Sequence, residues 1–402
     1  MNVPVALARP REDAVADRWI TLDVSRLLSR ARHRTPTGID RVELAYARAL
    51  LDAKDRRVRF AAWVPGLGLL AYRRSALRRY IAALERRWGT GGTAGYPAAM
   101  RAWSGVMPIP ARADGLHLIV SHQHLDRLHR RGRRAERLCV YLHDAIPSEY
   151  PEYARPGGAE RHRRRLRNSV AIADAILVNS HSTARSVETY MAEIGRRPEM
   201  LVAPLGIESA FVADRGADAG DAEPPYFVCV GTIEPRKNHL LLLQLWRALA
   251  ERLGDATPRL ILAGRRGWEN ENIVDLLERC PALQGKVTEA GRIGDRALAR
   301  LLADARAVLM PSFAEGFGLP VAEALAAGVP VIASDIPVLR ETGGEVPDYI
   351  DPLDGPGWSR AVLDYAEPQS PMRAAQIARM RGWRAPTWDA HFRNVLSFLD
   401  AL

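Results

Sequence analysis

Two glutamates stand in a glycine-rich segment, M-P-S-F-A-E-G-F-G-L-P-V-A-E-A-L-A-A-G-V-P-V-I-A-S, which runs from Met310 to Ser334. Glu315 lies in a loop whose two glycines let backbone N–H groups approach a ligand closely. The spacing predicts a helix between Pro320 and Gly328 that is apolar on all sides except at Glu323. A buried carboxylate there needs a partner, and the start of the helix favours negative charge on a ligand.

Two basic residues form a second candidate group in G-T-I-E-P-R-K-N, residues 231–238. This segment follows the predicted strand Tyr226–Val230 and precedes the predicted helix His239–Leu253. Arg236 and Lys237 therefore stand between a strand end and a helix start, where side chains and backbone together can hold a diphosphate.

These two segments resemble the E-x7-E signature and the phosphate-binding turn of the retaining glycosyltransferases of family four, which have the GT-B fold. The resemblance implies that Glu315 holds the transferred sugar and that Glu323 holds the ribose hydroxyls of a nucleotide sugar. The resemblance rests on specific motifs over most of residues 226–350, whereas over the first 210 residues it is only loose. The donor contacts that it implies are Gly38, Gly231, Thr232, Arg236, Lys237, Arg292, Ile293, Glu315, Gly316, Phe317, Gly318, Leu319 and Glu323.

His143 is the candidate catalytic residue of the first half, together with Arg236, Lys237 and Glu315 of the second. It ends the apolar segment Leu138–Pro147, and ligands of doubly wound sheets bind at the carboxyl ends of strands. Many family members carry a histidine at a comparable strand end. A capping or core histidine is the alternative interpretation. Gly38, in T-G-I-D-R, resembles the family's first glycine loop, although an ordinary turn explains it as well.

The predicted architecture is α/β: a GT-B fold of two Rossmann-like, doubly wound domains that face a central cleft. The 402 residues suit two domains, and apolar strands alternate with helices from Tyr226 onward. We expect an acceptor-side domain over 1–211, a linker over 212–225, a nucleotide-sugar-binding domain over 226–385, and a C-terminal helix over 386–402 that crosses back to the first domain.

The resemblance implies a retaining hexosyltransferase without a cofactor. We expect it to be metal-independent, because the sequence has no D-x-D motif that could hold a metal-bound nucleotide sugar. The departing diphosphate would itself help to deprotonate the acceptor. GDP-mannose is the expected donor, since the motifs look most like those of bacterial mannosyltransferases of surface-polysaccharide assembly. A UDP- or dTDP-sugar donor, a nucleotide-sugar epimerase and a phosphorylase on the same fold stay open.

Charge is unevenly distributed over a chain with net charge +10. Residues 1–211 hold 36 Lys+Arg against 21 Asp+Glu, or +15, and the rest holds 21 against 26, or −5. A basic first half suits an anionic partner such as a growing glycan on polyprenyl diphosphate. A nucleic-acid binder is the non-enzyme alternative, but the arginine clusters lack interleaved aromatics and no binding motif accompanies them.

The expected location is the cytoplasm, because three widely spaced cysteines and a charged N-terminus indicate neither disulfides nor export. Peripheral binding to an anionic membrane is a further expectation. It rests on Arg73–Trp88, whose Leu77, Ile81, Leu84 and Trp88 recur at helical spacing beside six arginines. The alternative is a domain helix with its apolar stripe on the core.

Overall fold

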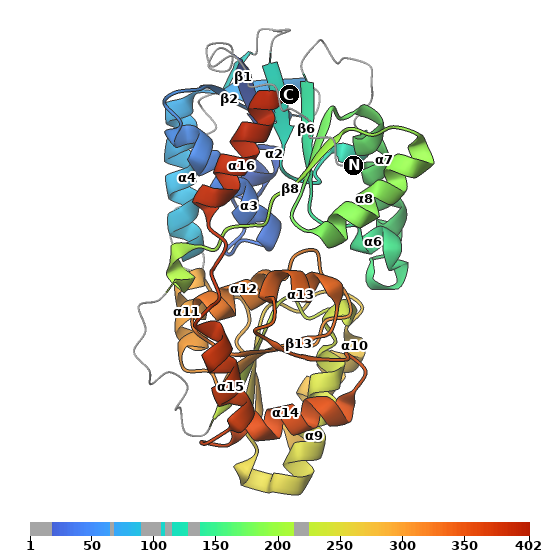
Figure 1. Ribbon diagram of the computed structural model, residues 1–402, viewed down its shortest axis with the longest axis vertical. Helices are drawn as coiled ribbons and strands as arrows, with labels where there is room; N and C mark the ends of the chain where they lie inside the picture. The colour runs from blue at the N-terminus through green and yellow to red at the C-terminus, as the bar shows by residue number, and fades with distance from the viewer. Residues whose placement is uncertain (1–17, 65–67, 90–105, 109–114, 128–136, 213–224) are drawn as a thin grey trace, which may run out of the picture.

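The chain folds into two α/β halves, each built on its own sheet (Figure 1). The computed structural model describes residues 18–64, 68–89, 106–108, 115–127, 137–212 and 225–402. The sheet changes between strands β8 and β9, and most of the predicted linker between them lies outside the described residues.

The first half has an eight-stranded sheet in the order β4-β3-β2-β1-β5-β6-β7-β8, parallel except where β3 pairs with β2 and with β4. Its strands are β1 (Trp19–Asp23), β2 (Arg57–Val64), β3 (Gly68–Tyr72), β4 (Val106–Pro108), β5 (Gly115–Ile119), β6 (Arg137–Leu142), β7 (Ala175–Val178) and β8 (Glu199–Val202). Its helices are α2 (Ser25–Ser29), α3 (Gly38–Asp52), α4 (Arg74–Gly89), α6 (Ile146–Glu149), α7 (Gly158–Ile172) and α8 (His181–Ile194).

The second half has a six-stranded, all-parallel sheet in the order β11-β10-β9-β12-β13-β14. Its strands are β9 (Tyr226–Val230), β10 (Arg259–Ala263), β11 (Val287–Glu289), β12 (Ala307–Met310), β13 (Val331–Ser334) and β14 (Asp348–Ile350). Its helices are α9 (His239–Leu253), α10 (Glu271–Arg279), α11 (Asp295–Ala303), α12 (Leu319–Ala326), α13 (Pro337–Gly343), α14 (Gly355–Ala366) and α15 (Pro371–Met380).

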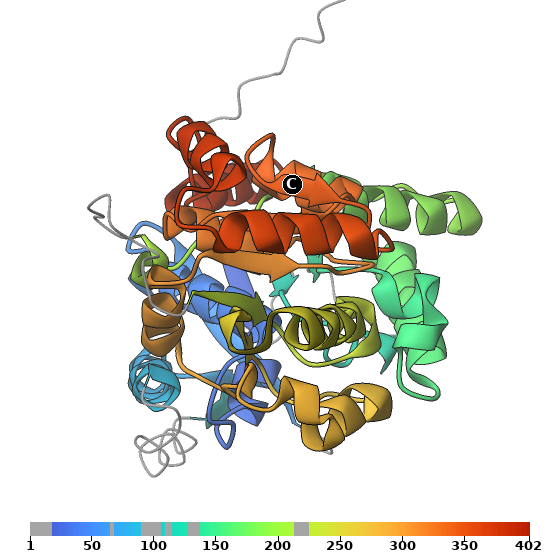
Figure 2. The same ribbon diagram turned by 90° about the horizontal axis from the view of Figure 1, so that it is seen from below.

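Both faces of the second sheet are covered, because successive strand residues point to opposite sides. Val228 and Val308 join a core with α11, α12 and α13, whereas Phe227 and Leu309 join a core with α9 and α14 on the other face (Figure 2). Two buried faces explain why these strands are continuous apolar runs.

The last helix, α16 (Trp388–Ala401), packs on the first half although it follows α15 of the second (Figure 1). Val395 and Leu399 are buried in the core that contains β1 and α3. The hydroxyl of Tyr46 and Nε2 of His391 are 2.8 Å apart, and Arg56 forms a bidentate ion pair with Asp400.

Helix α4 contradicts the prediction that Arg73–Trp88 docks on a membrane. Leu77, Ile81, Leu84 and Trp88 are at most 4% exposed, because the stripe faces the core of the first half. Arg74 donates to backbone carbonyls of α3, and Arg78 pairs with Asp52. The helix is an internal packing element with a basic outer face. No helix among the described residues is both long enough and apolar enough to cross a membrane.

Candidate active site

The carboxyl ends of β9 and β12 lie side by side at the centre of the second sheet, where the strand order changes direction. Open parallel sheets bind ligands at such a point, because loops from neighbouring strands diverge there. The turn 231–238 follows β9, and the loop 311–318 follows β12. Glu315 and the two cations of the sequence prediction therefore lie at the same edge of the sheet.

Glu315 is held by both cations of the turn. Its Oε1 lies 2.5 Å from Nζ of Lys237 and its Oε2 lies 2.9 Å from Nη1 of Arg236. Burial alone would raise the pKa of Glu315, but the charges of Arg236 and Lys237 outweigh it and lower that pKa to about 2. Glu315 is consequently ionised throughout the neutral range, and the cluster keeps a fixed pattern of charge.

Backbone contacts fasten the turn to the loop. Nη1 of Arg236 donates to the carbonyl of Ala314 at 2.8 Å, and the backbone N–H of Phe313 donates to the carbonyl of Arg236 at 2.8 Å. Gly231 has a φ of +146°, and a Cβ there would lie 3.1 Å from Cε of Lys237. Glycine thus leaves room for the lysine stem, while Thr232 continues the turn beside it.

The second glutamate has a partner from the other half of the chain. Glu323, on α12, accepts a hydrogen bond from Nη1 of Arg41 on α3 at 2.6 Å. Nη2 of Arg41 pairs with Asp295 at the start of α11. Burial raises the pKa of Glu323 to about 7, although the charge of Arg41 opposes the shift. The sequence predicted that a buried carboxylate at position 323 needs a partner. That partner is Arg41, which comes from the other half of the chain.

The starts of α3 and α12 face one another. Thr37 caps α3 through a capping box with Asp40, and Gly38 is the first helical residue. A Cβ on Gly38 would be 3.5 Å from Cδ1 of Leu319, the first residue of α12. The two helix N-termini therefore lie close together, which suits an anionic ligand.

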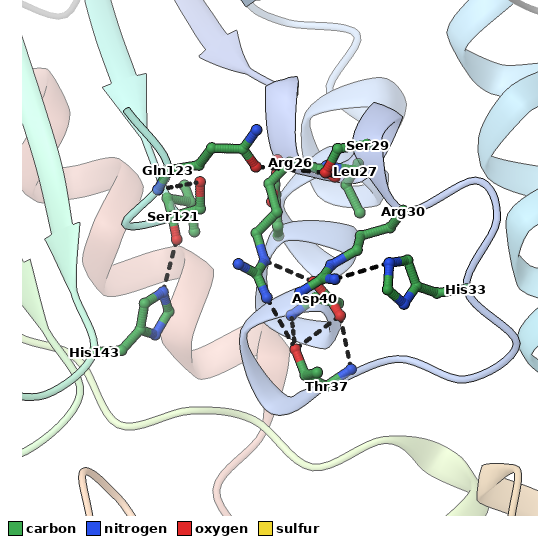
Figure 3. Close-up of polar contacts among 12 residues, drawn as sticks. Arg26, Leu27, Ser29, Arg30, His33, Thr37, Asp40, Ser121, Gln123 and His143 are labelled. Carbon is green, nitrogen blue, oxygen red and sulfur yellow. Dashed lines mark hydrogen bonds and ion pairs between the residues drawn. The ribbon is translucent and has the colours of Figure 1, made fainter. Parts of the chain in front are cut away.

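A basic group surrounds the capping box (Figure 3). Nε of Arg26 lies 2.6 Å from Oδ1 of Asp40, and Nε of Arg30 lies 3.2 Å from the same atom. Nη1 of Arg30 is 3.0 Å from Nε2 of His33. The single carboxylate of Asp40 thus pairs with the guanidinium groups of both Arg26 and Arg30, so this part of the first half has an excess of positive charge.

His143 is buried at the strand end, with only 5% of its surface exposed. Its Nε2–H donates to the carbonyl of Val120 at 2.7 Å, and its ring stacks on Tyr141 with centroids 4.6 Å apart. Burial lowers the pKa of His143 to about 4. The side chain is therefore a neutral core histidine, which was the alternative interpretation, and its backbone carbonyl faces the loop after β12.

The two halves touch through that loop. The hydroxyl of Ser180 donates to the carbonyl of Gly316 at 2.8 Å, and Glu341 of α13 accepts from the backbone N–H groups of His181 and Ser182. A Cβ added to Gly316 would lie 2.5 Å from the carbonyl oxygen of His143. Glycine at 316 is required by this close approach between halves.

We expect Gly316→Ala to impair catalysis by about tenfold or more while leaving each half folded, since about 1–3 kcal/mol is a usual cost of forcing extra atoms into a packed contact. The measurement is kcat/KM together with the thermal midpoint. Gly89→Ala is the control, because nothing lies within 4 Å of a Cβ there. Unchanged kcat/KM in Gly316→Ala would show that the observed closure is not the active arrangement.

Arg265 and Arg292 have no carboxylate partner among the described residues. Burial lowers the pKa of Arg265, and the charges of Arg292, Arg155 and Arg30 add to the effect. Arg292 and Ile293 belong to the turn before α11, and a Cβ on Gly294 of that turn would lie 3.0 Å from the carbonyl of Trp88. Cations of both halves therefore lie near Arg265, which pairs with no carboxylate within the described part of the chain.

A cavity of about 370 Å³ opens beside Glu315 between the two halves. Most of its polar lining comes from α8, from α6 and from the residues beside α6, and Phe313 supplies an aromatic wall. The side chains that can form hydrogen bonds there are Asp144, Glu149, Tyr150, Ser182, Thr183, Arg185, Ser186, Thr189 and Glu315. Within the described ranges, no group of three His, Cys, Asp or Glu residues could hold a metal ion.

Sequence reasoning missed Arg41, Asp295 and Arg265. Arg41 and Asp295 pair only after the halves come together, 254 positions apart in the chain. Arg41 did stand three residues after Gly38 in T-G-I-D-R, so its place on a helix start near a glycine was the available signal. Phe317 and Gly318 complete the loop, with Gly318 at φ +91°, and Leu319 begins α12.

Residues 213–345 match the family described as Glycosyl transferases group 1. This segment belongs to the group 1 glycosyltransferases. The predicted family is thereby confirmed, and the segment contains both glutamates and the turn 231–238.

Relatives and solved structures extend the comparison to the rest of the chain. O-antigen chain mannosyltransferase B of Escherichia coli is 32% identical over 257 residues, which are 62% of this chain and 65% of that protein. Serotype-specific mannosyltransferase WbdA of the same species is 32% identical over 227 residues, 52% of this chain and 27% of WbdA. The chain thus spans less than two thirds of either protein.

Anabaena Alr3699/HepE, solved in complex with UDP and glucose, superimposes with a TM-score of 0.63 at 16% identity over 96% of this chain and 100% of that one. At that identity the likeness concerns the fold, and it confirms the predicted GT-B architecture.

Proposed function

We propose that the protein transfers mannose with retention from GDP-mannose to a glycan or to a glycan on polyprenyl diphosphate. The observation that carries the proposal is the clamp of Arg236 and Lys237 on Glu315, at the central strand ends of the second sheet. Mannose is favoured because both bacterial relatives above are named mannosyltransferases.

The donor lies with its diphosphate against Arg236, Lys237 and the N–H groups at the start of α12. Glu315 then faces the sugar hydroxyls, and Glu323 accepts hydrogen bonds from the ribose. The bond from C1 to the phosphate oxygen breaks while the acceptor oxygen bonds to C1 on the same face. The acceptor proton passes to the leaving diphosphate. The protein's contribution is a set of fixed cationic and N–H donors placed where negative charge develops.

His143 acts in this proposal through its backbone rather than its imidazole. A neutral ring whose Nε2–H is committed to Val120 is a poor proton donor or acceptor at neutral pH. Its carbonyl, which faces Gly316, helps to set the position of the loop.

The acceptor enters the cavity beside Glu315. Carboxylates, hydroxyls and aromatic rings are the groups that bind sugars, and Asp144, Glu149, Tyr150 and Phe313 line this space. Because α6 and α8 belong to the first half, acceptor choice is assigned to that half, whereas donor choice belongs to the second.

Thermal-shift screening tests the donor. GDP-mannose is expected to raise the melting temperature more than UDP-glucose, UDP-N-acetylglucosamine or a dTDP-sugar, since a ligand stabilises in proportion to the logarithm of its concentration over its dissociation constant. A larger shift with a UDP-sugar would favour the second candidate, a UDP-dependent transferase, which the solved HepE complex suggests. No shift with any nucleotide sugar would reject the proposal.

Glu323→Ala is expected to weaken GDP binding about ten- to hundredfold, because a hydrogen bond to a charged group contributes roughly 1.5–3 kcal/mol. Glu323→Gln keeps the shape of the side chain and should lose less. Isothermal titration measures both affinities. A folded alanine variant with wild-type affinity would remove Glu323 from the nucleotide site.

Activity is expected to survive an excess of EDTA, because Arg236 and Lys237 supply the positive charge that a metal ion gives to a leaving diphosphate in other transferases. The test compares initial transfer rates with EDTA and with added Mg²⁺ or Mn²⁺. A strict requirement for either cation would contradict this part of the proposal.

A further inference from the structure

We infer that Arg41 is a positioning residue through which closure of the two halves prepares Glu323 to bind the ribose of the donor. The inference rests on the proposed function and extends it, because it assigns part of the donor affinity to the first half of the chain. Arg41 stands on α3, whereas both of its carboxylate partners, Glu323 and Asp295, stand on helices of the second half.

The geometry fixes Arg41 in place. Its side chain is 17% exposed, Nη1 and Nη2 engage different carboxylates, and its guanidinium carbon lies 5.8 Å from the ring centroid of Phe211 in the 3₁₀ helix Ser209–Phe211. A guanidinium held on three sides cannot turn away without breaking both ion pairs. Arg41 is therefore a fixed charge at the edge of the donor site.

Glu323 can accept further hydrogen bonds although it is paired with Arg41. Only its Oε1 is engaged, and its Oε2 has no partner within the described part of the chain. An ionised carboxylate offers about four lone-pair positions, so two ribose hydroxyls can still donate to it. A protonated carboxyl would instead offer a donor, and it would accept less well.

Arg41 is the cation that favours the ionised form of this carboxyl. The charged groups that face Glu323 are Arg41, Asp295 and Glu208, of which the last two are negative. Burial and the two carboxylates favour the neutral form, and Arg41 opposes them. When the halves separate, Glu323 loses Arg41, the one cation that faces it among the described residues. Donor affinity and closure are consequently coupled, and each must favour the other by the same factor.

The test follows GDP affinity by isothermal titration from pH 5.5 to 8.5 in wild type, Arg41→Met and Arg41→Gln. In the wild type, affinity should rise as pH rises through about 7, because Glu323 ionises. Both variants should move that rise to higher pH by about 1–3 units. At pH 7 they should bind GDP about tenfold more weakly or worse. Arg41→Lys should recover part of the loss.

Two controls separate positioning from general damage. Arg56→Met removes the ion pair between Arg56 and Asp400, which lies far from the donor site. Arg56 is a matched control because its side chain, like that of Arg41, is 17% exposed. The pH profile of this variant should match that of the wild type. In Glu323→Gln the added Arg41→Met change should cost less than about twofold, because Arg41 acts through Glu323. The terminal phosphate of GDP titrates alike in every variant, so differences between profiles report the protein.

A uniform loss of affinity at every pH, or additive losses in the double variant, would overturn the inference and leave Arg41 as an interdomain contact only. Wild-type protein that binds neither GDP nor UDP would instead reject the proposed function. The two failures are therefore distinguishable by the wild-type titration alone.

Discussion

Glu315→Ala is expected to lower the free energy of unfolding of the second half by about 3–5 kcal/mol, the usual effect of removing one partner of a buried ion pair. Glu315 and Lys237 are each 7% exposed at the side chain, so the variant leaves a buried ammonium without its carboxylate. Arg236 keeps Glu234, at 2.5 Å, and is affected less. Transfer activity should be lost as well.

Urea unfolding followed by tryptophan fluorescence measures this effect, since Trp246 and Trp358 are fully buried in the same half. Glu278→Ala is the matched control, because its pair with Arg266 is exposed and should be worth less than about 1 kcal/mol. Equal urea midpoints for Glu315→Ala and Glu278→Ala would show that Glu315, Arg236 and Lys237 do not form a stabilising buried ion-pair cluster. In the wild type this contribution is complete above the ordinary carboxyl pKa and is lost as pH falls toward 2, where folded Glu315 protonates.

Lys237→Met should reduce kcat by about 10²–10³, because it removes one preorganised cation from the leaving diphosphate, an effect of roughly 2.7–4 kcal/mol in comparable sites. Methionine keeps the unbranched stem that packs beside Gly231. Arg236 still pairs with Glu315 in this variant, so the loop should keep its position. The loss should therefore fall on kcat more than on stability.

Steady-state rates at saturating donor, with the melting temperature of each variant, measure the expected split. Lys286→Met is the control, because Lys286 pairs with an exposed Asp255 away from the site. A folded Lys237→Met enzyme with kcat within threefold of the wild type would contradict the role of Lys237 in stabilising the leaving group.

The second half was predictable from sequence because its signals are local. Tyr226–Val230, Arg259–Ala263 and Ala307–Met310 are apolar runs bounded by turn residues. The first forms β9 with the predicted limits, and the other two form β10 and β12 among the alternating strands expected from Tyr226 onward. Glycine loops beside these strands indicated the site.

The first half was less predictable because its signals depend on contacts between distant segments. The apolar stripe of α4 has the same spacing whether it meets a membrane or a core, and only the fold shows that it is buried. Strand β8 was not predicted, because its four residues at the sheet edge are short and only partly buried. Likewise, the role of Arg41 can be recognised only in the folded structure, where α3 contacts α12.

Product stereochemistry with GDP-mannose tests the central claim most directly. Purified protein is incubated with GDP-mannose and a panel of mannoside acceptors that carry a lipid-like tag, and the new linkage is read from its one-bond C1–H1 coupling by NMR. The account predicts an α-linked mannose, the configuration of the donor, with no product from Lys237→Met on the same time scale. A β-linked product, or transfer only from another nucleotide sugar, would contradict it.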